Sequence, residues 1–202
     1  STFPREMEGQ PVGAYLLITL DSDSEDQLYT LLEQAAELVL DAGAMDVLVA
    51  DSPAKMRDAW AARSAFLEVI MEETKLLDEC DVVVPVTKIA SYLEFVNKTG
   101  EECGLVIRSF GHAGDGNLHI YECSNDLTEE EFKKRVDKFF DLIYKEASAQ
   151  GGLVSGEHGI GSGKIQYLVE SIGETNMALM EGIKRVFDPK MILNPGKVCY
   201  RL

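Results

Sequence analysis

The sequence is short of positive charge: 19 Lys and Arg residues stand against 35 Asp and Glu residues, for a formal net charge of −16. Binding to a nucleic-acid backbone requires a basic surface, so a nucleic-acid partner is excluded. The same imbalance disfavours attraction to anionic membrane surfaces. Long apolar runs are also lacking. None approaches the roughly 20 residues of a membrane span, and the N-terminus shows no basic-then-apolar signal pattern.

Cysteine is scarce, and its spacing forms no C-x-x-C pair. The four residues are Cys80, Cys103, Cys123 and Cys199. In a chain of this size they predict reduced, buried or neutral thiols of a cytoplasmic protein, with a disulfide framework as the less favoured alternative. An initiator methionine is missing too, because the sequence begins STFPREMEGQ. We therefore expect residues 1–202 to form one domain of a longer polypeptide.

The composition that is present, 46% hydrophobic and 27% charged, is that of an ordinary globular domain. Short apolar runs predict strands, and longer stretches with helical apolar spacing predict helices. The expected strands cover 13–20, 45–50, 80–85, 105–112 and 117–123, with a further short strand near 153. The expected helices cover about 25–42, 52–73, 87–99 and 129–149, followed by helical stretches to about 186 and an irregular tail.

Helices and strands alternate, but a hairpin between the last two long strands forces antiparallel pairing. The order therefore favours an α+β fold: an antiparallel, ferredoxin-like (split βαβ) sheet with helices packed on one face, plus a C-terminal helical segment and tail. Gly100 is expected to end the third helix. Trp60 is expected in the core, as are the apolar residues of the later helices: Phe132, Phe139, Phe140, Met177, Met180 and Phe187.

Two of the three histidines lie in GHAGDGNLHI, residues 111–120. Asp115-Gly116 between two strand-like runs is typical of a two-residue type I′ hairpin turn. That turn would pair His112 with His119 and bring their Cβ atoms about 4.5–5.5 Å apart on one face. Two imidazoles at that separation can share one metal ion. A looser loop would change the register and still bring the strand ends together.

The third histidine lies in SGEHGIGSGK, residues 155–164, where Glu157 offers a third ligand and His158 follows it. Adjacent residues on an extended backbone point opposite ways, so one of the pair can bind metal while the other faces elsewhere. Two histidines and a carboxylate suit zinc, manganese or ferrous iron. The alternative is that both glycine-rich stretches are plain turns, and the spacing alone leaves this open. A phosphate loop is rejected because the GxxxxGK[ST] spacing is absent.

Three segments together, GHAGDGNLHI, SGEHGIG with Lys164 beyond it, and FDPKMILNPGK, resemble a known family. This is the C-terminal domain of FAD-linked D-2-hydroxyacid oxidases and dehydrogenases of the vanillyl-alcohol-oxidase type, which include glycolate oxidase large subunits, D-lactate dehydrogenases and D-2-hydroxyglutarate dehydrogenases. The resemblance implies that an N-terminal FAD-binding domain accompanies this one, which caps the flavin. It also implies that the isolated domain is inactive.

The same resemblance implies roles for particular residues. The metal ligands correspond to His112, His119 and Glu157, and the catalytic base corresponds to His158. Arg63, in the W-x-x-R stretch that begins at Trp60, corresponds to the arginine that binds the substrate carboxylate. Asn194, which opens the NPGK tail, corresponds to the segment that returns toward the flavin domain. Lys164 is left between neutralising the bound acid and capping a carbonyl, and Asp115 is assigned only to the turn.

Two positions depart from the hydroxyglutarate enzymes: Glu79 stands where they have lysine, and Tyr121 stands where they have asparagine. We therefore expect no recognition of a distal carboxylate and a small monoacid substrate, glycolate or D-lactate. The flavin would pass electrons to an electron-transferring flavoprotein, a quinone or an iron–sulfur subunit. Two other functions stay open, a metal-binding module without flavin chemistry and a metal-dependent hydrolase.

Overall fold

The computed structural model describes residues 3–4 and 6–199, which divide into two compact units, one up to Leu67 and one from Glu68 onward. The N-terminal unit contains a short antiparallel pair of strands, β1 (Glu6–Met7) and β2 (Gln10–Pro11), and the helices α1 (Glu25–Asp41) and α2 (Pro53–Ser64). Side-chain caps begin both helices, because the Ser24 hydroxyl accepts from the Gln27 N–H and the Ser52 hydroxyl from the Lys55 N–H.

The strands expected at 13–20 and 45–50 are wrong. Neither segment takes part in strand pairing in the described part of the chain, and their apolar side chains are exposed, Leu16 by 66% and Leu48 by 55%. An apolar run becomes a strand only where a neighbouring strand satisfies its backbone N–H and C=O groups. The hydrophobicity of a segment does not show whether a partner strand lies beside it, so the pattern alone could not predict these two segments correctly.

The single helix expected over 52–73 is divided at Ala65 into α2 and α3 (Phe66–Glu73). The Ala65 N–H donates to the carbonyls of both Ala61 and Ala62, which tightens the last turn of α2 and ends it. Only Ala59 is buried in α2. Trp60, which was expected in the core, is half exposed.

The second unit is built on a three-stranded antiparallel sheet of β3 (Leu76–Val83), β4 (Val106–His112) and β5 (Asn117–Ser124), in the order β3-β5-β4. β5 lies between two strands that are joined through a helix, which is the split βαβ arrangement. Leu153 forms an isolated antiparallel bridge with Val83 on the outer side of β3. The α+β class is therefore confirmed, although the strand expected near 153 is reduced to this bridge.

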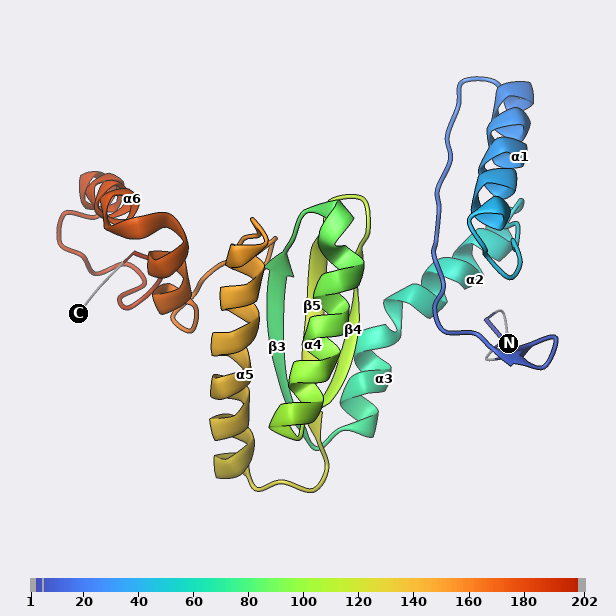
Figure 1. Cartoon of the computed structure of the whole chain (residues 1–202). Coiled ribbons are helices and arrows are strands. Elements are labelled where there is room, and N and C mark those ends of the chain that lie inside the picture. The colour runs from blue at the N-terminus through green and yellow to red at the C-terminus, as the bar shows by residue number, and fades with distance from the viewer. Residues whose placement is uncertain (1–2, 5, 200–202) are drawn as a thin grey trace. The chain divides into compact units, whose positions relative to one another are not determined.

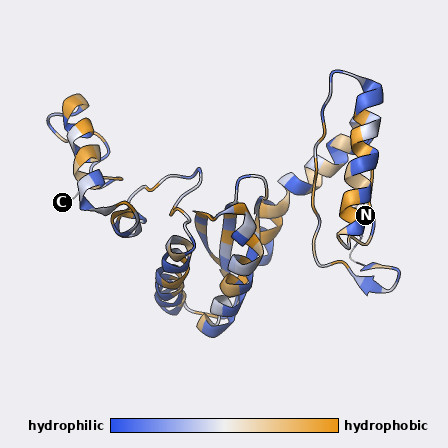
Figure 2. Ribbon diagram, turned by 45° about the horizontal axis from the view of Figure 1, so that its top comes forward, coloured by the Kyte–Doolittle hydropathy of each residue, from blue (hydrophilic) through white to orange (hydrophobic). Residues whose placement is uncertain are grey.

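Two helices cover one face of this sheet (Figure 1): α4 (Ile89–Cys103), which follows the 3-10 turn η1 (Val86–Lys88), and α5 (Glu129–Ala149). Apolar and polar residues interchange along both helices (Figure 2). The residues at helical spacing that face inward are buried with the sheet: Tyr92, Val96 and Cys103 of α4, and Phe132, Val136, Phe139, Ile143 and Ala147 of α5. This packing leaves the opposite face of the sheet available for polar groups.

The helix expected to end at Gly100 continues to Cys103 and ends at Gly104, whose left-handed φ of 67° closes it. Gly100 is buried inside the helix, where a Cβ atom would collide with the side chain of Ile107. This glycine therefore permits close packing of α4 on β4 and does not stop the helix. The start of α5 is as expected, with a capping box between Thr128 and Glu131.

The last helix, α6 (Ile165–Phe187), contains a kink at Gly173 and leads into an irregular segment. Met177 is buried and Met180 is partly buried, as expected for the core. Phe187 is 81% exposed, so its expected place in the core is wrong. All four cysteines are buried and free. No helix in the described residues has the length and apolarity needed to cross a membrane.

Candidate metal and substrate site

The hairpin that carries two histidines has a different register from the expected one. His112 pairs with Asn117, and Phe110 pairs with His119, so the connection is the four residues Ala113–Gly116. The Gly116 N–H donates to the His112 carbonyl at 3.0 Å, and the Asp115 carboxylate accepts from the Asn117 N–H at 3.0 Å. These bonds close a wider loop than the two-residue turn, and the expected direct pairing of His112 with His119 is wrong.

The expected proximity of the two histidines survives this change. The register differs from the expected one by two residues, and an even shift keeps every side chain on its own face of the sheet. His112 and His119 are consequently diagonal neighbours, with ring centroids 5.8 Å apart and ring planes at 80°. The hairpin therefore places both imidazoles on the face that α4 and α5 leave uncovered.

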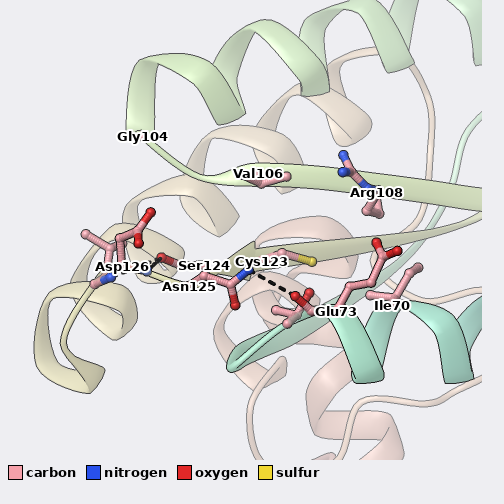
Figure 3. Close-up of a pocket in the computed structure, with 11 residues that line it drawn as sticks. Ile70, Glu73, Gly104, Val106, Arg108, Cys123, Ser124, Asn125 and Asp126 are labelled. Atoms are coloured by element: carbon pink, nitrogen blue, oxygen red, sulfur yellow. Dashed lines mark hydrogen bonds between the residues drawn. The ribbon is translucent and has the colours of Figure 1, made fainter.

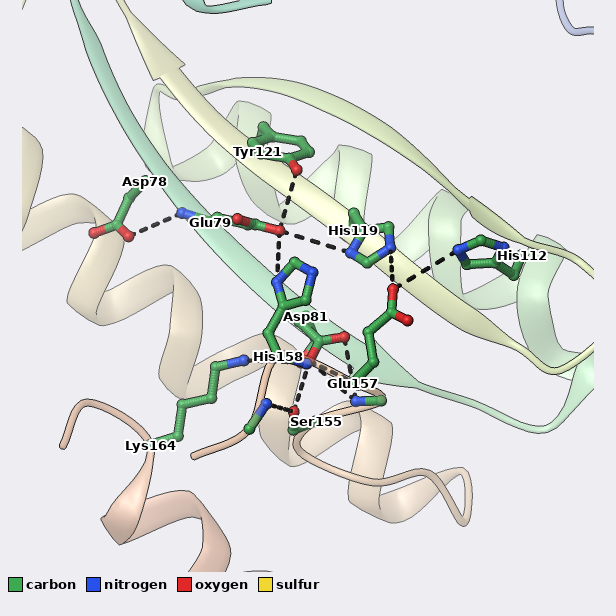
Figure 4. Close-up of polar contacts among 12 residues, drawn as sticks. Asp78, Glu79, Asp81, His112, His119, Tyr121, Ser155, Glu157, His158 and Lys164 are labelled. Carbon is green, nitrogen blue, oxygen red and sulfur yellow. Dashed lines mark hydrogen bonds and ion pairs between the residues drawn. The ribbon is translucent and has the colours of Figure 1, made fainter. Parts of the chain in front are cut away.

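Glu157 reaches both histidines from the loop after Leu153 (Figure 4). Its Oε1 atom lies 3.2 Å from His119 Nε2 and 3.7 Å from His112 Nε2. The three donor atoms all lie within 4.8 Å of one another. Two imidazole nitrogens and one carboxylate oxygen are suitable ligands for a zinc, manganese or ferrous ion, so the residues fit the metal expected there.

His158 approaches His119 from another side than Glu157 does. Its imidazole stacks on that of His119, with centroids 4.8 Å apart and planes at 22°. Its Nδ1 atom lies 3.0 Å from Oε1 of Glu79, and Tyr121 donates its hydroxyl to the same oxygen at 3.1 Å. Glu157 and His158 are thus adjacent in sequence but occupy separate positions around one buried histidine.

The loop that carries Glu157 and His158 is held by a single buried carboxylate. Asp81 of β3 accepts hydrogen bonds from the Ser155 hydroxyl at 2.6 Å and from the backbone N–H groups of Gly156, Glu157 and His158 at 3.1, 3.3 and 2.9 Å. Lys164 donates to the Asp81 carbonyl at 3.2 Å, and its Nζ lies 3.8 Å from the carboxylate. Of the two roles considered for Lys164, these contacts favour the capping of a carbonyl over the neutralisation of a bound acid.

Burial lowers the pKa of His119 and the charge of nearby His158 adds to this, while Asp81, Glu79 and Glu157 act in the opposite direction. The net lowering favours the neutral ring that a metal ligand requires. Burial alone would raise the pKa of Asp81, but the Ser155 hydrogen bond, the loop N–H groups and Lys164 together bring it below its ordinary value. Burial and the charge of Glu79 raise the pKa of Tyr121, so its hydroxyl stays a donor.

Glycines surround the site because backbone and side chains approach closely there. A Cβ atom at Gly156 would collide with the side-chain amide of Asn117, which is buried. A Cβ atom at Gly111 would collide with the Asn117 carbonyl. The two glycine-rich stretches are thus packed against each other through Asn117, which brings the Glu157 loop to the histidine hairpin.

Sequence reasoning missed Asp81 as an anchor and treated Glu79 and Tyr121 only as departures from a family pattern. A signal was present. Glu79 and Asp81 are two residues apart in a strand that is otherwise largely apolar, so both side chains lie on one face. Their strand partners are Tyr121 and His119, which places the carboxylates directly beside the site.

Two other expected residues belong to other segments of the chain. Arg63 belongs to α2 in the N-terminal unit. Asn194 is exposed on the segment after α6, with a left-handed φ of 47°. Asp188 organises this segment, because its carboxylate accepts from the Ile192 and Leu193 N–H groups and from Lys184. The roles of Arg63 and Asn194 remain predictions.

A cavity of about 320 Å³ lies at the other end of the β4–β5 hairpin, between the start of β4, the end of β5 and α3 (Figure 3). Val106, Arg108 and Cys123 line it, and the Asn125 side chain donates to the Glu73 carbonyl at 2.9 Å at its edge. None of the histidines lines this cavity, so it is separate from the candidate site.

Comparison with known proteins identifies the family. The family model described as "FAD linked oxidases, C-terminal domain" matches residues 4–198. The chain belongs to this family. A D-lactate dehydrogenase of Anaerostipes hadrus is 60% identical over 99% of the chain, and one of Archaeoglobus fulgidus is 37% identical over 94%. Glycolate oxidase subunit GlcD of Bacillus subtilis is 31% identical over 94%.

The chain spans 42% of the length of the Anaerostipes relative and 40% of each of the other two. Membership confirms the resemblance drawn from the three sequence segments and supports FAD as the cofactor of the whole protein.

Proposed function

We propose that this FAD-linked oxidase domain binds the substrate and a divalent metal in an enzyme that oxidises a small D-2-hydroxy acid to the 2-oxo acid. The observation that carries the proposal is the convergence of His112, His119, Glu157 and His158 on one face of the sheet. Three of these offer a set of metal donors, and the fourth is a separate imidazole stacked on one of them. The names of the relatives, D-lactate dehydrogenase and glycolate oxidase, support the substrate class.

His112, His119 and Glu157 would hold the metal. When bound, a divalent cation supplies a Lewis acid that lowers the pKa of the substrate hydroxyl, and FAD supplies the acceptor for the α-hydride. The side chains themselves bind and orient the substrate and move its proton. His158 is the proposed base, because a neutral imidazole has a nitrogen lone pair that can accept the hydroxyl proton.

Arg63 is proposed to bind the substrate carboxylate in a bidentate fork, which would orient the α-hydrogen toward the flavin. Asn194 is proposed to contact the flavin side of the active site through the C-terminal segment. Both roles come from the family resemblance, and each is supported by its place in a matching sequence stretch. Substitution of Arg63 by Lys, which cannot form the same fork, should raise KM for the acid more than it lowers kcat.

The substrate is proposed to be a monoacid, D-lactate or glycolate. Glu79 and Tyr121 stand beside His158 and His119, and the Glu79 carboxylate would repel a second carboxylate of a diacid. Electrons would leave the flavin for an electron-transferring flavoprotein, a quinone or an iron–sulfur subunit. A cytoplasmic location belongs to the same proposal, and the four free thiols support it.

The test uses the full-length protein that contains this domain, reconstituted with FAD. Anaerobic addition of D-lactate or glycolate should bleach the flavin absorbance, whereas L-lactate should leave it unchanged. Flavin that stays oxidised with every 2-hydroxy acid would contradict the proposal. A full-length protein that binds metal and no flavin would instead favour the metal-binding module or the hydrolase.

A further inference from the structure

We propose that Glu79 is a positioning residue for His158. Its carboxylate holds the imidazole in the tautomer with the proton on Nδ1, so that Nε2 carries the lone pair that accepts a proton. This inference rests on the proposed function only in taking His158 as the base. The close Glu79–His158 contact and the tautomer themselves are properties of the chain that can be measured without turnover.

Two distances show which histidine Glu79 contacts more closely. Glu79 Oε1 lies 3.0 Å from His158 Nδ1, within hydrogen-bond range, and 3.6 Å from His119 Nδ1, which is beyond it. A carboxylate only accepts hydrogen bonds, so the nitrogen that faces it must carry the proton. In a neutral imidazole the other nitrogen, Nε2, is then the acceptor.

Glu79 is itself held in place. Tyr121 donates its hydroxyl to Glu79 Oε1 at 3.1 Å, and Tyr121 is buried in the strand directly opposite. The Glu79 side chain is only 31% exposed. A carboxylate that is already held in place loses less conformational entropy on pairing with the imidazole than a freely rotating carboxylate would. The pair is therefore preorganised.

His158 is restrained by three contacts. Glu79 binds its edge, the imidazole of His119 lies parallel to its face, and Asp81 accepts a hydrogen bond from its backbone N–H at 2.9 Å. Glu79 and Asp81 are alternate residues of β3 (Figure 4), so one strand face fixes both the backbone and the side chain of His158. Loss of Glu79 alone should free the ring and leave the loop in place.

The test compares variants of the full-length flavoprotein. In Glu79→Leu, which removes the acceptor, kcat should fall about 10–100-fold while KM changes little, because histidine-orienting partners act on chemistry and not on substrate binding. Glu79→Gln should rescue most of this loss, because its amide oxygen still accepts from Nδ1–H. Tyr121→Phe should give a smaller loss than Glu79→Leu. Glu94→Gln, at an exposed acid on α4, is the matched control and should behave as wild type.

The second measurement is independent of turnover. In ¹⁵N-histidine NMR spectra, with the His158 signals assigned by their loss in His158→Gln, wild type should show the Nδ1–H tautomer and Glu79→Leu should lose it. An Nε2–H tautomer in wild type, or a Glu79→Leu protein with unchanged kcat, would overturn the inference. If wild type does not oxidise a 2-hydroxy acid at all, the proposed function fails, and the NMR result still decides whether Glu79 orients His158.

Discussion

The carboxylate of Asp81 accepts a hydrogen bond from the backbone N–H of His158 at 2.9 Å, which links strand β3 to the loop that carries the proposed base. The same carboxylate binds Ser155 and the two intervening N–H groups, so the loop is built around one buried charge. The hairpin provides two histidines, and Asp81 brings the remaining two site residues to them.

Replacement of Asp81 by Ala should destabilise the protein by about 2–4 kcal/mol, because Lys164 and several N–H groups lose their partner. The folded-state pKa of Asp81 is lowered, so its contribution is present above the unfolded value of about 3.9 and is lost as pH falls below it. Urea unfolding at several pH values measures this. Asp137→Asn, at an exposed position of α5, should change stability by less than about 0.5 kcal/mol, and equal effects of the two variants would contradict the anchor role.

Two glycines of the site loops should differ in their response to the addition of one methyl group. Gly156→Ala should displace the Glu157 loop, because the new Cβ collides with the buried Asn117 side chain. The variant should lose about 1–3 kcal/mol of folding stability and should bind metal more weakly. Gly114→Ala meets nothing within 4 Å and should be neutral. Unfolding curves and metal analysis of both proteins test this, and a neutral Gly156→Ala would show that the loop does not need the close approach.

A buried acid on the helix-covered face of the sheet should set part of the pH dependence of stability. Glu122 is 0% exposed, and neither carboxylate oxygen has a hydrogen-bond partner among the described residues. Burial, with the charge of Asp78 adding to it, raises the pKa of Glu122 well above its ordinary value. The folded protein thus keeps a proton that the unfolded chain releases, so stability should fall as pH rises above about 4.3 toward the folded-state pKa.

Glu122→Gln should remove this pH dependence and raise stability at neutral pH by about 1–3 kcal/mol, since a neutral amide takes up no proton when the chain folds. Glu94→Gln, an exposed change of the same kind, is the control. A Glu122→Gln protein that is less stable than wild type at neutral pH, with an unchanged pH profile, would show that Glu122 is charged in the folded state.

The split βαβ order and the approximate starts of α1, α2 and α5 could be predicted from the sequence, because the patterns that mark helices are local signals. The strands expected at 13–20 and 45–50 failed because pairing depends on a partner that a local pattern does not identify. Gly100 was misread for the same reason: its role is contact with Ile107 and not the end of α4.

The candidate ligands of the site could be predicted from the sequence, but the residues that hold them in place could not. Histidine and glutamate near glycine turns gave the cluster of His112, His119, Glu157 and His158, although the hairpin register was two residues away from the expected one. Asp81 and Glu79 escaped notice because their importance arises from strand pairing with His119 and Tyr121, which brings together residues about 40 positions apart.

The central claim is that His112 and His119 bind the metal while His158 acts as the base. It is tested most directly by anaerobic flavin reduction by D-lactate in full-length His158→Ala, with metal and FAD contents determined on the same sample. The claim predicts metal and FAD contents equal to wild type and flavin reduction slowed about 10²–10⁴-fold, the usual contribution of a general base. His119→Ala should instead lose metal. Reduction at the wild-type rate in His158→Ala, or metal loss as complete as in His119→Ala, would contradict the claim, and the latter would point to Glu79, His119 and His158 as the metal ligands.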